Sequence, residues 1–197
     1  MFTKDWKKDL FTIPNVLSLF RLLLIPVYIV LYLKAKSPED YFLAASILAV
    51  SCLTDLIDGK IARHFNMISN TGKILDPLAD KATQFALIIC LTLRTRHPAL
   101  PFLATLFVIK ELFQAIAGFL LLRKGQILKG ALMAGKLSTT VLFISLIVMV
   151  LIPDISKTAM YIISVIDIAF LMIAFVGYIR LYFTDSSMIQ SINEGAE

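Results

Sequence analysis

The sequence has 197 residues, of which 58% are hydrophobic and only 17% are charged, and its mean hydropathy is +0.83. A soluble domain is roughly half apolar and about a quarter charged, so this composition excludes a disordered chain and argues against a soluble globule. Two cysteines are too few for a disulfide-dense scaffold. The bilayer is the solvent that remains, and at roughly 20 residues per span the chain has room for about six membrane helices.

The excess of basic residues is also consistent with a membrane protein. The formal net charge is +5, but in a membrane chain Lys and Arg report topology and contact with anionic lipid headgroups. We therefore expect membrane lipids as partners and no nucleic acid.

The first segment, residues 1–12, predicts a helix that lies on the membrane surface. Lys4, Lys7 and Lys8 alternate there with aromatic and aliphatic residues. Trp6 and Leu10 are four residues apart and would share one face of a helix. Basic and apolar residues separated in this way are typical of an interfacial amphipathic helix.

Six apolar segments follow and predict six transmembrane helices. They cover residues 14–33, 41–61, 73–93, 100–122, 132–152 and 158–183. The first is longer than the core of a signal peptide and no small-residue cleavage site follows it, so we expect it to be retained. The predicted fold is therefore an all-α integral membrane protein with an interfacial helix (1–12), a transmembrane domain (13–184) and a polar C-terminal tail (185–197).

The connections between these segments differ in charge. On one side of the membrane, which includes both termini, the loops and helix ends carry eleven Lys and Arg residues. On the other side they carry five. By the positive-inside rule the basic side faces the cytoplasm. We expect a bacterial-type plasma membrane protein with both termini inside.

Four aspartates form the most informative pattern in the chain. Asp55 and Asp58 are three residues apart at the cytoplasmic end of the second predicted span, and Asp76 and Asp80 are four apart at the start of the third. Each pair shares one face of its helix. Because the connection is short, the two spans should be antiparallel neighbours, and all four carboxylates can meet at the membrane boundary.

Gathering carboxylates in such a place is costly unless a cation accompanies them. Oxygen ligands without His or Cys suit Mg²⁺ or Mn²⁺ rather than Zn²⁺. Four carboxylates could hold two divalent ions, an arrangement that suits phosphoryl transfer. The alternative is that these acids only form interfacial salt bridges with the basic residues beside them, which are Lys60, Arg63, Lys73 and Lys81.

The same stretch resembles the signature of the CDP-alcohol phosphatidyltransferases. Its matching residues are Asp55-x-x-Asp58-Gly59-x-x-Ala62-Arg63, then eight residues, then Gly72-x-x-x-Asp76-x-x-x-Asp80. Two further segments are similar to phosphatidylglycerophosphate synthases and related cardiolipin synthases. They are Ile13-Pro14-Asn15-Val16-Leu17-Ser18-Leu19-Phe20-Arg21 and Asp76-Pro77-Leu78-Ala79-Asp80-Lys81.

The resemblance implies six transmembrane helices, a homodimer and two divalent cations, Mg²⁺ or Mn²⁺. It implies transfer of a phosphatidyl group from CDP-diacylglycerol to an alcohol, with release of CMP. Asp55, Asp58 and Asp76 would be metal ligands, and Asp80 would be the general base and a further ligand. The residues implied for the CDP pocket are Gly59, Ala62, Arg63 and Gly72.

The acceptor that we expect from the resemblance is glycerol 3-phosphate, which would give phosphatidylglycerophosphate. Glycerol 3-phosphate would need cations near its phosphate, and the candidates are Arg21, Lys81, Lys110, Arg123 and Lys136. Many phosphatidylglycerophosphate synthases carry a second lysine where this chain has Ser138. Cardiolipin synthases of this type also tend to lack it, so phosphatidylglycerol is the alternative acceptor.

An alternative of another class is an ion transporter that uses buried carboxylates. Transporter sites tend to lie mid-membrane between repeated halves. The aspartates of this chain gather at one boundary, and the sequence contains no repeat. The sequence therefore favours the transferase.

Overall fold

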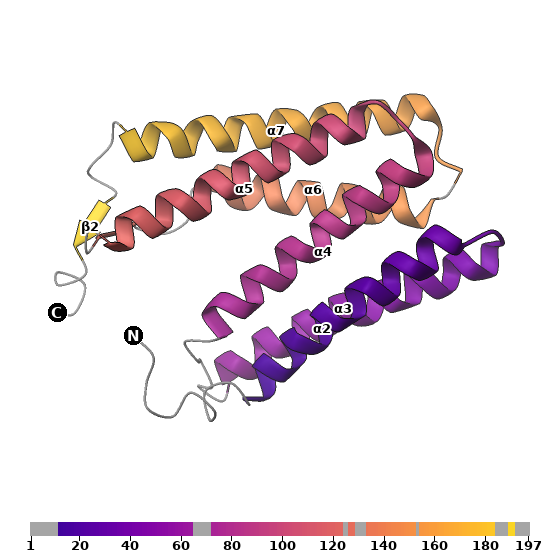
Figure 1. The fold of residues 1–197 in the computed structure, drawn as a ribbon, viewed down its shortest axis with the longest axis horizontal. Helices are drawn as coiled ribbons and strands as arrows, with labels where there is room; N and C mark the ends of the chain where they lie inside the picture. Colours follow the sequence, from indigo (N-terminus) through magenta and orange to yellow (C-terminus); the bar gives the residue numbers. More distant parts are fainter. Residues whose placement is uncertain are drawn as a thin grey trace. The chain divides into compact units, whose positions relative to one another are not determined.

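The computed structural model describes residues 12–64, 72–123, 126–128, 133–152, 154–183 and 189–191. Six long helices and two short strands make up this part of the chain (Figure 1). The helices are α2 (Ile13–Lys34), α3 (Pro38–His64), α4 (Gly72–Thr95), α5 (Ala99–Arg123), α6 (Met133–Leu151) and α7 (Lys157–Phe183). The predicted all-α membrane class is confirmed. The predicted interfacial helix at 1–12 lies, except for Thr12, outside the described residues.

Each described helix is long enough to cross a bilayer. By length and composition α2, α5, α6 and α7 contain candidate spans, with mean hydropathies between 1.7 and 2.5. The other two, α3 and α4, have 27 and 24 residues. At about 1.5 Å per residue they extend roughly 40 and 36 Å, more than the roughly 30 Å of hydrocarbon.

The two strands were not predicted from the sequence. β1 (Gln126–Leu128) follows α5, and β2 (Ile189–Ser191) follows α7. They pair antiparallel, with Ile127 opposite Gln190. The predicted polar tail, residues 185–197, therefore contains a short paired strand. A strand of three residues is too short to show the alternation of polar and apolar residues by which strands are predicted.

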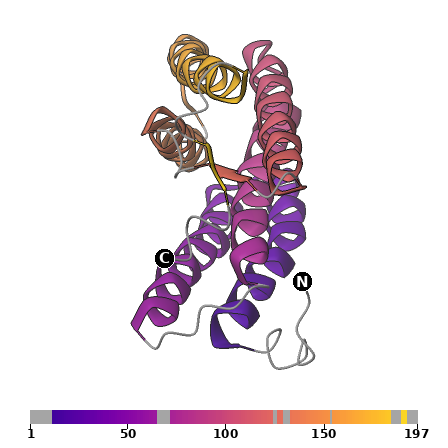
Figure 2. The ribbon, with the colours of Figure 1, turned by 90° about the vertical axis from the view of Figure 1, so that its left-hand side faces the viewer.

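The chain divides into two compact units, Met1–Thr95 and Arg96–Glu197, and each is described by itself. In the first unit α2 packs along both α3 and α4 (Figures 1 and 2). In the second unit α7 packs along both α5 and α6. The predicted break between the first two spans is confirmed, because α2 ends at Lys34 and α3 begins at Pro38.

A capping box starts α3. The backbone N–H of Lys36 and that of Ser37 donate to Asp40 Oδ2 at 2.9 and 3.0 Å, and the N–H of Asp40 donates to Ser37 Oγ at 3.3 Å. These exchanges satisfy backbone donors that a helix start leaves unpaired, and Pro38 occupies a first-turn position that needs no donor. The same backbone donors lower the pKa of the Asp40 carboxyl.

The polarity of α2 is the reverse of that of a helix in a soluble protein. Asn15, Ser18, Arg21, Tyr28 and Tyr32 recur on one face and are buried. The large residues exposed on the opposite side are apolar: Val16, Leu19, Phe20, Leu23, Val27 and Val30. Polar groups inside and aliphatic groups outside are what a hydrocarbon solvent requires.

The second unit follows the same rule. Its buried polar side chains include Lys110 on α5, Ser138 on α6, and Ser164 and Asp167 on α7. Large apolar side chains such as Phe102 and Ile173 are exposed. This unit therefore also presents its apolar surface outward.

A glycine allows α6 and α7 to approach each other. A Cβ atom at Gly135 would lie 2.9 Å from Tyr178 Cε2 and would overlap the Tyr178 hydroxyl. In contrast, a Cβ atom at Gly118 on α5 would meet no atom within 4 Å. Gly135 is thus required for close packing, whereas Gly118 is not.

We predict that Gly135→Ala destabilises the second unit, because the added methyl group must displace the Tyr178 ring. Overpacking of this kind costs about 1–3 kcal/mol. A lower midpoint of thermal unfolding in detergent would show the effect. The matched control is Gly118→Ala, which should leave the midpoint unchanged or raise it, and equal midpoints for the two variants would contradict the prediction.

Candidate metal centre

Three aspartates of the signature meet in the first unit. Asp55 lies on α3, and Asp76 and Asp80 lie one turn apart on the same face of α4. One carboxylate oxygen from each lies within 4.8 Å of the others. Hard oxygen atoms at this spacing form a donor set that suits a divalent cation such as Mg²⁺. The described residues thus supply at least three candidate ligands from two helices.

An arginine from the third helix lies among these carboxylates. Arg21 Nη1 donates to Asp55 Oδ1 and, at 2.6 Å, to Asp80 Oδ1. Its Nη2 atom donates to Asp76 Oδ1 at 2.7 Å. The sequence predicts Arg21 as a contact for the acceptor phosphate. The structure places its guanidinium among the three carboxylates.

The cluster is closed on one side and open on another. The Arg21 side chain is 3% exposed, whereas the three aspartate side chains are 40–46% exposed. The guanidinium therefore lies on the interior side of the carboxylates. The accessible side is left for a cation or a substrate.

The remaining signature residues continue along the same two helices. Asp58, Gly59, Ala62 and Arg63 follow Asp55 on α3, but their side chains lie outside the described part. Gly72 is the first residue of α4. The structure therefore defines the helix positions of all the signature residues but the side-chain contacts of only some.

The cations expected to bind an acceptor phosphate are divided between the units. Lys81 follows Asp80 on α4 and is partly exposed. Lys110, Arg123 and Lys136 lie in the second unit. Lys110 is 1% exposed, and its Nζ atom is 2.8 Å from Glu111 Oε1 and 5.8 Å from the centre of the Tyr178 ring.

The other two cations expected to bind the acceptor phosphate, Arg123 and Lys136, are on the surface of the second unit. Arg123 ends α5, with its guanidinium carbon 4.9 Å from the centre of the Phe119 ring, and Lys136 lies in the first turn of α6. Both are exposed. Ser138 is fully buried, and its hydroxyl donates to the backbone oxygen of Gly135 at 3.0 Å.

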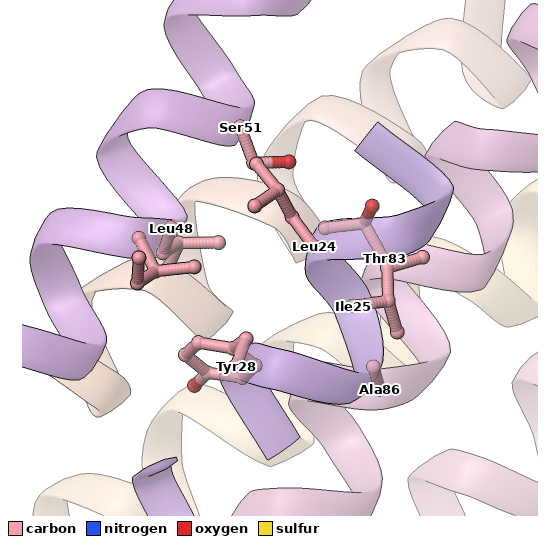
Figure 3. Close-up of a pocket in the computed structure, with 8 residues that line it drawn as sticks. Leu24, Ile25, Tyr28, Leu48, Ser51, Thr83 and Ala86 are labelled. Atoms are coloured by element: carbon pink, nitrogen blue, oxygen red, sulfur yellow. The ribbon is translucent and has the colours of Figure 1, made fainter. Parts of the chain in front are cut away.

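A small pocket beside the cluster was missed from the sequence (Figure 3). It is lined by Leu24, Ile25, Tyr28, Ile47, Leu48, Ser51, Thr83 and Ala86. Its volume of about 10 Å³ is close to the space that one water molecule needs. Leu24, Ser51 and Thr83 each lie one helical turn from a cluster residue, so helical spacing from the signature could have located it.

Comparison with known proteins agrees with this geometry. The model of the family described as CDP-alcohol phosphatidyltransferase matches residues 11–182, a range that includes Arg21 and all four aspartates.

Curated relatives with two different names are similar to the chain. A cardiolipin synthase (CMP-forming) from Streptomyces coelicolor is 39% identical over 44% of this chain and 41% of its own length. Proteins named CDP-diacylglycerol–glycerol-3-phosphate 3-phosphatidyltransferase also match, among them those from Rickettsia bellii and Cereibacter sphaeroides. The one from Rickettsia bellii is 36% identical over 53% of this chain and 59% of its own length. The one from Cereibacter sphaeroides is 32% identical over 71% of this chain and 63% of its own length.

The chain spans less than two thirds of the length of each of these relatives. The family model, in contrast, covers most of the chain and includes the whole carboxylate cluster. On that match, the chain belongs to the CDP-alcohol phosphatidyltransferase family.

Proposed function

We propose that this membrane protein transfers a phosphatidyl group from CDP-diacylglycerol to an alcohol and releases CMP. The observation that carries the proposal is the meeting of Asp55, Asp76 and Asp80 on two family-signature helices. Their partly exposed carboxylates give a polar substrate access to a site in helices long enough to span the bilayer. A lipid donor and a polar acceptor can meet there.

Two divalent cations, Mg²⁺ or Mn²⁺, are proposed for the site. Asp55, Asp76 and Asp80 would hold them together with Asp58, the next acidic residue on the same face of α3. When bound, such ions would neutralise the pyrophosphate and the charge that develops on CMP as it leaves. The carboxylate donor set fits this role, because it contains only hard oxygen atoms.

Asp80 is proposed as the general base. Its carboxylate would accept the proton of the acceptor hydroxyl, and the hydroxyl oxygen would form a bond to the lipid-linked phosphorus. The bond from that phosphorus to the oxygen of CMP would break, and its electron pair would leave with CMP. Gly59, Ala62, Arg63 and Gly72 would shape the pocket for the cytidine diphosphate.

Glycerol 3-phosphate is the acceptor that we propose, which gives phosphatidylglycerophosphate. Lys81 supports this choice, because it is partly exposed and directly follows Asp80 on α4. Arg123 and Lys136 remain proposed contacts. The support from Arg21 and Lys110 is weaker than expected, because both form ion pairs with carboxylates.

Phosphatidylglycerol is the alternative acceptor, and the product would then be cardiolipin. Ser138 favours this alternative, because the buried serine supplies no positive charge for a phosphate. Some relatives bear the one name and some the other. The acceptor must therefore be found by experiment.

A carboxylate-based ion transporter is the alternative of another class. Membership of a transferase family argues against it. We propose further that the catalytic unit is the six-helix domain at 13–184 and that the protein forms a homodimer. Its site would face the cytoplasm of a bacterial-type plasma membrane.

We predict that the purified protein releases CMP from CDP-diacylglycerol only with Mg²⁺ or Mn²⁺ and an alcohol, and that EDTA abolishes the release. Glycerol 3-phosphate and phosphatidylglycerol would be supplied in parallel, with chromatography of the lipid product as the measurement. Turnover with only the first supports phosphatidylglycerophosphate synthesis, and turnover with only the second identifies a cardiolipin synthase. Metal-dependent ion flux in vesicles, without CMP release from CDP-diacylglycerol in the presence of any alcohol, would refute the transferase.

We predict that Asp80→Asn lowers kcat by at least about 10²-fold, since the amide cannot accept the hydroxyl proton. Initial rates of CMP release at saturating substrate would measure the loss. The matched control is Asp154→Asn, an exposed aspartate between α6 and α7, which should keep the wild-type rate. A rate within a few-fold of wild type for Asp80→Asn would remove Asp80 from the general-base role.

A further inference from the structure

The Arg21 guanidinium is engaged with three carboxylates at once. Its two terminal nitrogens donate to the Oδ1 atoms of Asp55, Asp76 and Asp80. The donors form a planar fork, so one side chain can hold oxygen atoms from two helices in a fixed arrangement. Arg21 thereby connects α2 to both α3 and α4 on the interior side of the cluster.

The charge on this side chain is permanent. A guanidinium keeps its proton in proteins, and at 3% exposure the Arg21 side chain is shielded from water. Three carboxylates whose oxygens lie within 4.8 Å repel one another. The positive charge of Arg21 opposes that repulsion.

A divalent ion in the same cluster would lie very close to this charge. Metal–oxygen distances for Mg²⁺ are about 2.1 Å, and Arg21 Nη1 is 2.6 Å from Asp80 Oδ1. An ion bound to that oxygen would therefore lie within about 5 Å of Nη1. At this separation two cations in a partly buried site repel strongly.

We propose that Arg21 is an internal counter-cation of the carboxylate cluster. It holds Asp55, Asp76 and Asp80 together in the metal-free protein and competes with divalent cations for their oxygens. The proposal rests on the metal role of the cluster proposed above. Arg21 is then a positioning residue that weakens metal binding and stabilises the metal-free state.

The position of Arg21 makes the competition persistent. The residue lies on the buried face of α2, on the same stripe as Ser18 and Tyr28. While the first unit remains packed, the guanidinium cannot rotate into water, so solvent does not screen its charge. A bound metal would therefore continue to experience the repulsion.

Manganese binding to the purified full-length chain tests the proposal directly. Electron paramagnetic resonance of free Mn²⁺ gives the affinity without any turnover. We predict that Arg21→Gln binds Mn²⁺ at least tenfold more tightly than the wild type. In EDTA its unfolding midpoint should fall by several degrees, and saturating Mn²⁺ should restore it.

Two further variants keep the test interpretable. Arg21→Lys retains the positive charge without the fork and should have an affinity between those of the wild type and Arg21→Gln. Lys157→Gln removes one positive charge at an exposed position at the start of α7. It should leave both the Mn²⁺ affinity and the unfolding midpoint unchanged.

The possible failures differ from one another. In one outcome the wild type binds Mn²⁺ and releases CMP, and Arg21→Gln binds Mn²⁺ equally or more weakly. That result would overturn the proposal that Arg21 competes with the metal and would leave the proposed function standing. Weaker binding by Arg21→Lys than by the wild type would overturn the proposed competition even if Arg21→Gln did not fold. A wild type that binds no Mn²⁺ would overturn both this inference and the proposed metal centre.

Discussion

Repulsion among carboxylates is the constraint around which the first unit is built. Asp55, Asp76 and Asp80 come together because α3 and α4 present them at the same level, and each loses part of its hydration there. The opposing charge comes from Arg21 on α2, the helix that packs along both others. The three-helix arrangement and the acidic site therefore depend on each other, since the arginine reaches all three acids only when α2 is in place.

Both units contain buried polar groups in helices that are surrounded by hydrocarbon. Arg21 in one unit and Lys110 in the other are long cationic side chains that are almost wholly buried and paired with acids. A cation in a membrane helix is costly to bury alone and tolerable when paired. Burial of a lysine in such a chain thus has a structural explanation, which weakens the case that Lys110 binds a phosphate.

Local spacing predicted much of the fold and part of the site. The six helices follow from the lengths of the apolar segments, and the spacing of Asp76 and Asp80 is sufficient to place them on one face of α4. Arg21 could not be placed in this way, because no spacing within α2 tells which neighbouring helix its buried face contacts. The β1–β2 pair escaped prediction for a different reason, since three residues from each partner carry no periodic signal. For Asp58 and the proposed CDP-pocket residues of α3, the structure gives the helix but not the side-chain contacts.

The pairing of β1 with β2 has a consequence for how the chain is threaded through the membrane. The strands follow α5 and α7, and their hydrogen bonds hold the end of one helix beside the end of the other. Two points joined in this way must lie on the same side of a bilayer, so the chain between them must cross it an even number of times. The helices between the two strands are α6 and α7. An even number of crossings requires that either both of them cross the bilayer or neither does. This short backbone ladder thus forbids any insertion in which only one of the two helices spans the membrane.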